Sequence, residues 1–122
     1  MDKVDVLLDE AEKDIKVGCY NKAVSASYFA VSMEIEKLGY KLRTTIPRRD
    51  DKLINILMHL GKDSLAKEAM YLYKKRKDAD YGYESLKEED AMKCLEISKR
   101  LVQEIGKIIR GYESSSTPSH KQ

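Results

Sequence analysis

The chain has 122 residues, enough for one domain with a single hydrophobic core. Charged residues make up 36% of it, but 23 Lys and Arg stand against 21 Asp and Glu, so the formal net charge is only +2. This balance excludes a protein that coats nucleic acid by bulk charge, and any site for a polyanion must be local. The two cysteines, Cys19 and Cys94, lie far apart, which argues against a disulfide scaffold and predicts reduced thiols.

The beginning of the chain carries acidic residues from position 2 and has no apolar segment, which is not the pattern of a secretory signal. The longest uncharged run, residues 23–33, is too short to span a bilayer. We therefore expect a cytoplasmic protein without a membrane contact.

Two helices are predicted in the first third of the chain. The first has apolar residues at helical spacing and ends at Gly18: Val4, Leu8, Ala11 and Ile15. The second covers residues 20–38 and ends before Gly39; it has an uncharged centre and a stripe of small side chains, Ala23, Ser27 and Ala30. Because its apolar arc is broad, this helix is expected at the centre of a bundle or also on a dimer face, and since its uncharged surface exceeds what a monomer needs, we predict a two-fold dimer.

Three further helices follow a loop that contains Pro47. A short third helix, capped by Asp50 or Asp51, reaches Gly61, and a fourth is expected to be capped by Asp63 or Ser64. Residues 85–88 form a capping box, with Ser85 and Glu88 at its two ends, that starts a long fifth helix.

These elements predict an all-α fold, an antiparallel up-and-down bundle of four to five helices joined by short connections. The bundle is expected to occupy residues 1–112. The tail, residues 113–122, is polar and low in complexity, and is predicted to be disordered.

The fourth helix places a cation in register with apolar residues. Arg76 continues the stripe of Leu65, Ala69 and Leu72, and Asp80 follows it by four residues, so that the two can pair. Two interpretations are open. In one, a buried ion pair fixes helix packing, and Arg76→Ala destabilises the fold; in the other, Arg76 lines a polar cleft and offers fixed donors to a phosphate or carboxylate.

Two segments carry a resemblance to a known family. "SASYFAV" at 25–31 and "LYKKRKDADYG" at 72–82, with Arg76, Ala79, Asp80 and Tyr81 spaced as in the archaeal branch, resemble the HEPN domain family (higher eukaryotes and prokaryotes nucleotide-binding). The resemblance covers the chain to about residue 110 and implies a helical bundle that forms a homodimer, with the polar motif near the dimer cleft.

The resemblance also implies what the site does. Many relatives are metal-independent endoribonucleases of toxin–antitoxin or defence systems, and others act beside a minimal nucleotidyltransferase protein. Ribonuclease members carry Arg, four to six residues, and then His. Arg76 matches the Arg, but Tyr81 stands at the His position after four intervening residues, and no His lies between Arg76 and the tail.

Three functional hypotheses follow. The first, which we favour, is a dimeric module that binds a nucleotide, RNA or a nucleotidyltransferase partner through Arg76 and Asp80. Tyr28 is a candidate to support this site from behind, although packing in the core is the safer interpretation of that residue. The second is a ribonuclease with Arg76 and Tyr81 as catalytic residues, although a tyrosine hydroxyl, with an ordinary pKa of about 10, is a poor base near neutrality. The third is a dimeric scaffold without catalysis.

Other candidate sites are weaker. His59 is isolated and is interpreted as structural, His120 lies in the tail, and the two cysteines are distant, so neither a metal site nor a cofactor is expected. Ser25, Ser27 and Ser32 form no Ser-His-Asp pattern and are interpreted as packing residues.

Overall fold

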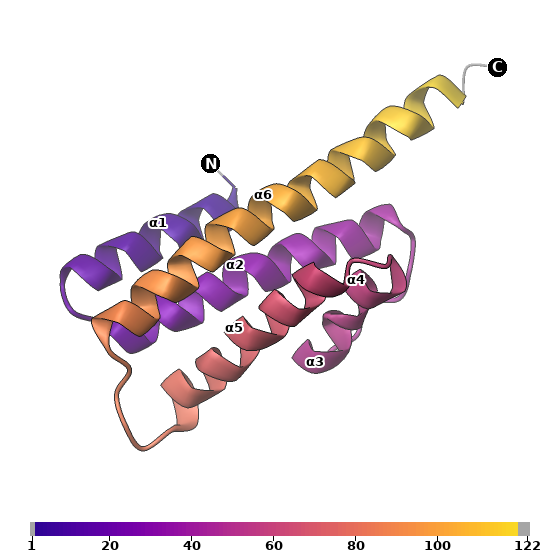
Figure 1. Cartoon of the computed structure of the whole chain (residues 1–122). Helices are drawn as coiled ribbons and strands as arrows, with labels where there is room; N and C mark the ends of the chain where they lie inside the picture. Colours follow the sequence, from indigo (N-terminus) through magenta and orange to yellow (C-terminus); the bar gives the residue numbers. More distant parts are fainter. Residues whose placement is uncertain (1, 120–122) are drawn as a thin grey trace.

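The computed structural model describes residues 2–119, with side chains to residue 113, and all of its regular structure is helical (Figure 1). Two short helices lie between the second and third of four long ones. In chain order the six are α1 (Lys3–Lys16), α2 (Tyr20–Lys41), α3 (Asp50–Leu53), α4 (Asn55–His59), α5 (Asp63–Tyr81) and α6 (Glu88–Ser119). Successive long helices run in opposite directions, which confirms the predicted all-α up-and-down bundle. None of the helices in this described part is long and apolar enough to cross a membrane.

Helix α2 lies at the centre of the bundle. It packs against α1, α5 and α6, and twelve of its 22 residues are buried. Its largest buried side chains are Tyr28, Ile35 and Leu38, each fully removed from solvent. The broad apolar arc is therefore covered within one chain, as the first of the two alternatives for this helix requires, and it does not by itself call for a dimer face.

The stripe of small side chains on α2 lies at a close helix crossing. Ala23, Ser27 and Ala30 are all fully buried. The Ser98 hydroxyl of α6 donates a 2.6 Å hydrogen bond to the backbone carbonyl of Ser27, which is possible only where the two helices approach closely. The Ser27 hydroxyl in turn donates to the carbonyl of Ala23, so both buried hydroxyls have acceptors.

The end of α2 differs from the prediction. The helix continues through Gly39 to Lys41, and the chain turns at Arg43, whose φ of 56° is left-handed. Gly39 has a different role: a Cβ there would lie 2.5 Å from the tip of the Ile46 side chain, so the glycine lets the following loop pack onto the helix without a shift of that side chain. Gly18 and Gly61, with φ of 83° and 74°, follow α1 and α4 as expected.

The predicted third helix is two short helices. The helical hydrogen bonding is interrupted at Ile54, which separates α3 from α4. The predicted side-chain caps are absent: Arg49 and Lys62 occupy the N-cap positions of α3 and α5, and neither makes a side-chain capping bond. The Asp50 carboxylate, one of the expected caps, is directed to another helix.

Helix α6 begins and ends later than predicted. It starts at Glu88, and the Asp90 carboxylate accepts a hydrogen bond from the backbone N–H of Lys87, which is the reach-back contact of a capping box shifted by two residues. The predicted boundary at residues 112–113 falls inside α6, because the helix continues through Gly106 and Gly111 to Ser119 and projects beyond the other helices (Figure 1). The rest of the predicted tail, residues 120–122, lies outside the described residues.

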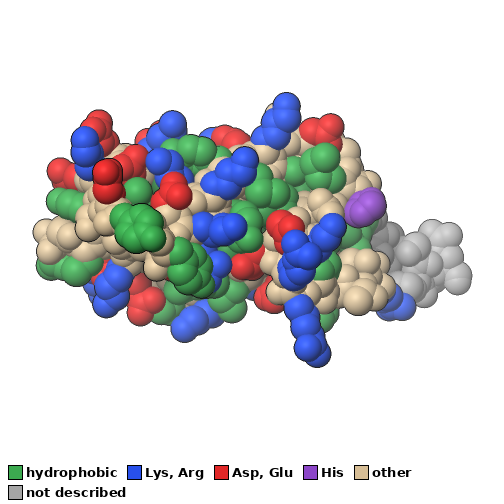
Figure 2. Space-filling view, turned by 90° about the horizontal axis from the view of Figure 1, so that it is seen from below, with side chains coloured by type: hydrophobic (Ala, Val, Ile, Leu, Met, Phe, Trp, Pro, Cys, Tyr) green, Lys and Arg blue, Asp and Glu red, His purple; other side chains and the backbone are tan. Residues whose placement is uncertain are grey.

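The face of the bundle seen from below carries charges of both signs (Figure 2). On this face, Lys and Arg side chains stand beside Asp and Glu. Several ion pairs join neighbouring helices, among them Lys99 with Glu12 and Arg100 with Glu68. This distribution agrees with the near-zero balance of the composition.

The close crossing of α2 with α6 predicts the effect of a larger side chain at Ala30. Ala30→Leu should lower the free energy of unfolding by about 1–3 kcal/mol, because a fully buried site beside a close helix contact has no room for the added atoms. Chemical denaturation measures the change. Tyr40→Leu, at a position on the same helix that is 69% exposed, is the control and should change stability little. Equal stabilities of Ala30→Leu and the natural protein would contradict the close approach.

Burial also predicts the reactivity of the two thiols. Burial raises the pKa of the Cys94 thiol to about 11, whereas Cys19 is partly exposed. Since only the thiolate reacts, Cys94 should be almost inert to a thiol reagent at pH 8 until the protein unfolds, while Cys19 is modified in the native state. A Cys19→Ser variant isolates the Cys94 signal. Rapid native-state labelling of that variant would contradict the burial of Cys94.

Candidate functional site

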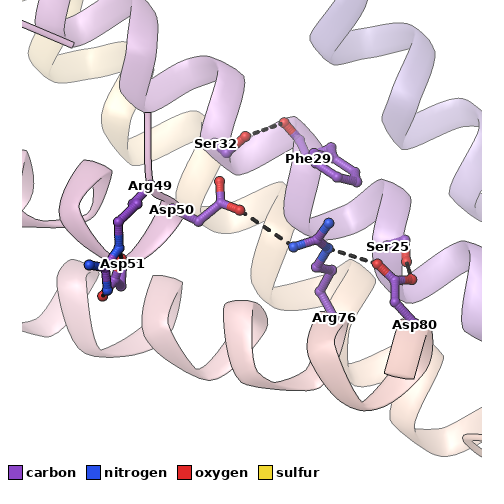
Figure 3. Close-up of polar contacts among 8 residues, drawn as sticks. All are labelled: Ser25, Phe29, Ser32, Arg49, Asp50, Asp51, Arg76 and Asp80. Carbon is purple, nitrogen blue, oxygen red and sulfur yellow. Dashed lines mark hydrogen bonds and ion pairs between the residues drawn. The ribbon is translucent and has the colours of Figure 1, made fainter. Parts of the chain in front are cut away.

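Arg76 is held between carboxylates from two helices (Figure 3). Its Nε lies 2.8 Å from Oδ2 of Asp80, one turn later on α5, and its Nη1 lies 3.4 Å from Oδ2 of Asp50 at the start of α3. The predicted pairing with Asp80 is therefore present. The contact with Asp50 was missed, because the sequence suggested only a capping role for that residue and gave no signal that α3 folds back onto α5.

Helix α2 supplies the third side of this cluster. The guanidinium carbon of Arg76 lies 5.0 Å from the centre of the Phe29 ring, within the range of a cation–π contact. The Ser25 hydroxyl donates a 2.7 Å hydrogen bond to Oδ1 of Asp80, so that carboxylate is held from both sides. We call Ser25, Phe29, Asp50, Arg76 and Asp80 the Arg76 cluster.

Tyr28 lies behind the cluster in the core. It is fully buried, its ring packs against Phe29 and Tyr73, and its hydroxyl makes no hydrogen bond of normal geometry within the described residues. Burial, and then the nearby charge of Asp50, raise the pKa of the Tyr28 hydroxyl. The hydroxyl therefore stays neutral, and in this conformation its burial keeps it from contact with a ligand at the surface.

The charges of the Arg76 cluster are not balanced. One cation faces two carboxylates, and all three side chains are mostly shielded: Arg76 is 18% exposed, Asp50 30% and Asp80 29%. The Nη2 nitrogen takes part in neither ion pair (Figure 3). The cluster is thus intermediate between the two interpretations of the sequence, neither a dry buried pair nor an open cleft, and its guanidinium is already neutralised by its own chain.

A groove of about 890 Å³ lies beside the cluster, between α1, α2 and the end of α5. Its lining mixes apolar and charged side chains: Leu7, Glu10, Lys13, Asp14, Asn21, Lys22, Ser25, Ala26, Phe29, Ala79, Asp80 and Tyr81. Ser25, Phe29 and Asp80 belong to both the groove and the Arg76 cluster, whereas Arg76 itself does not line the groove. The sequence did not reveal this groove, since the lining residues of α1 read only as the polar face of an amphipathic helix.

The structure separates the two residues proposed as a catalytic pair. Arg76 and Tyr81 are five positions apart on one helix, which places them about 140° apart around its axis. Arg76 points into the cluster, whereas Tyr81 is 72% exposed and lines the groove. They therefore do not converge on one reacting atom in this conformation.

The remaining sequence candidates do not form a second site. His59 is exposed on α4, and the hydroxyls of Ser27 and Ser32 donate to backbone carbonyls. Lys75 and Lys77 lie over tyrosine rings of α5. Within the described residues, no group of three or more His, Cys, Asp or Glu side chains is arranged to hold a metal ion.

The Arg76 cluster predicts a stability cost for loss of its cation. Arg76→Ala should lower the free energy of unfolding by about 1–3 kcal/mol, because two partly buried carboxylates then face each other without a counter-charge. Asp50→Asn should cost about 1 kcal/mol or less, since Arg76 keeps Asp80. Chemical denaturation measures both values.

Lys74→Ala is the matched control for this prediction, since it removes an exposed cation from the same helix. It should change stability by about 0.5 kcal/mol or less. If Arg76→Ala is no less stable than Lys74→Ala, the cluster does not contribute to folding.

The comparison with protein families gives one match. The model described as the HEPN domain matches residues 5–109, which covers the bundle from α1 to most of α6 and includes the Arg76 cluster. A search of curated proteins found no match.

Proposed function

The chain belongs to the HEPN family, and from this membership we propose that it is a dimeric, non-catalytic module that binds a partner protein of the minimal nucleotidyltransferase type. HEPN domains are nucleotide- or RNA-related modules that commonly dimerise. The proposal places this chain in a toxin–antitoxin or defence pair, with the groove beside the Arg76 cluster as the contact surface.

The observation that carries the proposal is the neutralisation of Arg76. A guanidinium stabilises the charge of a reacting phosphate only when it is free to meet that phosphate. Here Asp50 and Asp80 both pair with Arg76, so an incoming phosphate is repelled by two carboxylates unless one of them moves away.

The second partner of the ribonuclease motif is also unsuited to catalysis. Tyr81 replaces the His of the family pattern and lies on a different face of α5 from Arg76. Cleavage of RNA would need a base within hydrogen-bond reach of the attacking hydroxyl, and the cluster offers only carboxylates already engaged by Arg76 and Ser25. These features support binding over catalysis.

The groove has the composition of a protein contact. It combines apolar side chains, the exposed rings of Phe29 and Tyr81, and charges of both signs. Interfaces between proteins are enriched in aromatic anchors surrounded by a polar rim, whereas a site for nucleic acid needs a positive surface. Three carboxylates against two lysines do not provide one.

The proposal predicts assembly and the lack of cleavage. Purified alone, the protein should have the mass of two 14.0 kDa chains by light scattering and should leave single-stranded RNA uncut. Co-expressed with a minimal nucleotidyltransferase from the same genome, it should elute as a larger complex. Tyr81→Ala should weaken that complex about tenfold or more, because an exposed aromatic anchor is lost from the groove.

Tyr40→Ala is the matched control, because Tyr40 is as exposed as Tyr81 but lies near the other end of α2. It should leave the complex intact. RNA cleavage that disappears in Arg76→Ala would establish the ribonuclease alternative instead. If the natural protein binds a nucleotide or RNA and Arg76→Ala does not, the surface beside the groove binds a nucleic acid and not a partner protein.

A further inference from the structure

The charges of the groove point to the chemistry of what it binds. Resting on the proposed partner function, we propose that the groove accepts an amphipathic helix of the partner that carries Lys or Arg beside its apolar face.

The groove has the opposite sign to the chain as a whole. The chain carries a formal charge of +2, whereas the groove is lined by three carboxylates and two ammonium groups. Lys13 is paired outside the groove lining, 3.0 Å from Asp9. Arg76, the cation nearest to Asp80, is shared with Asp50. Asp80 therefore has a cation that it shares with Asp50, and Lys22 is the one lining lysine left without an ion pair within residues 2–113.

Two carboxylates of α1 that line the groove lack an ion-pair partner within residues 2–113. These are Glu10 and Asp14, which lie four positions apart on one face of the helix. Like charges at this spacing repel and destabilise a helix. Lys22, the only lining lysine without an ion pair in the same range, cannot balance both. A cation from outside would relieve this repulsion, whereas a phosphate would increase it.

The apolar lining favours a helix as the occupant. Leu7, Ala26, Phe29 and Ala79 come from three helices and form the apolar part of a groove between them. Residues 2–119 contain no strand, so they offer no sheet edge to which an extended peptide could add. An apolar floor with charged rims matches the mode in which a helix lays its apolar face in a groove and its charged flanks against the rims.

The test uses two synthetic helical peptides. Each has about four turns, roughly 14 residues, with Leu at i, i+3, i+4 and i+7 spacing; one has Lys at the flanking positions and the other has Glu. Fluorescence anisotropy measures their Kd values for the whole protein. The Lys peptide should bind about tenfold tighter or more than the Glu peptide, and this difference should shrink when salt is raised from about 0.05 M to about 0.3 M.

Charge reversal locates the binding. The double variant Glu10→Lys/Asp14→Lys should lose the preference for the Lys peptide or invert it. Glu89→Lys/Glu96→Lys changes the net charge by the same amount at exposed positions of α6 and should keep the preference. The proposal is overturned if both peptides bind alike, or if both double variants reduce Lys-peptide binding equally.

The same variant separates this inference from the proposed function. If the nucleotidyltransferase complex forms with the natural protein and is unchanged in Glu10→Lys/Asp14→Lys, the partner function stands and the basic-helix chemistry is wrong. If no complex forms with the natural protein, the proposed function fails, whatever the peptides show. Both the proposed function and this inference would be overturned if a single-stranded RNA displaced the Lys peptide from the groove and Arg76→Ala abolished that displacement.

Discussion

Helix α2 contacts the three other long helices, and twelve of its 22 residues are buried, so the positions of α1, α5 and α6 all follow from packing against it. Small side chains at its crossing with α6 allow the two backbones to approach, and larger ones, including Tyr28 and Ile35, fill the space on other sides. The apolar residues of this core are covered within one chain, without a second copy. Any dimer contact must therefore use the outer surface of the bundle, where exposed aromatic side chains such as Phe29 are found.

The Arg76 cluster lies where the apolar stripe of α5 leaves the core and meets solvent. Leu72, one turn before Arg76 on the same stripe, is fully buried, whereas the side chain of Asp80, one turn after it, is 29% exposed. An arginine places its stem along the apolar stripe and its guanidinium against Phe29 and two carboxylates, which ties α5 to α2 and α3 at once. The question posed by a cation on an apolar stripe is thus answered by its place at the edge of the core.

The long helices and the Arg76–Asp80 pair could be predicted from the sequence, whereas contacts that depend on tertiary folding could not. Helical periodicity and spacing of four residues identified the long helices and the Arg76–Asp80 pair, because both depend on geometry within one helix. The contact of Asp50 with Arg76, 26 positions apart, depends on how the short helices between α2 and α5 fold back. The groove likewise needs three helices in place, and Gly39 was misread because its glycine serves packing, not helix termination.

The charge of the Arg76 cluster and the absence of a histidine at position 81 both bear on what the protein can bind. A phosphodiester brings its own negative charge to a cluster in which two carboxylates already face one guanidinium, so binding it requires a carboxylate to be displaced or protonated. Lys22 is the one lining lysine of the neighbouring groove that has no ion pair in residues 2–113, and the carboxylates Glu10 and Asp14 outnumber it. A protein partner avoids this cost, since its cations add attraction and its apolar side chains can cover Phe29 and Tyr81. The lack of His at position 81 and the excess of carboxylates therefore both support the proposal that this surface binds a basic protein segment and not a scissile phosphate.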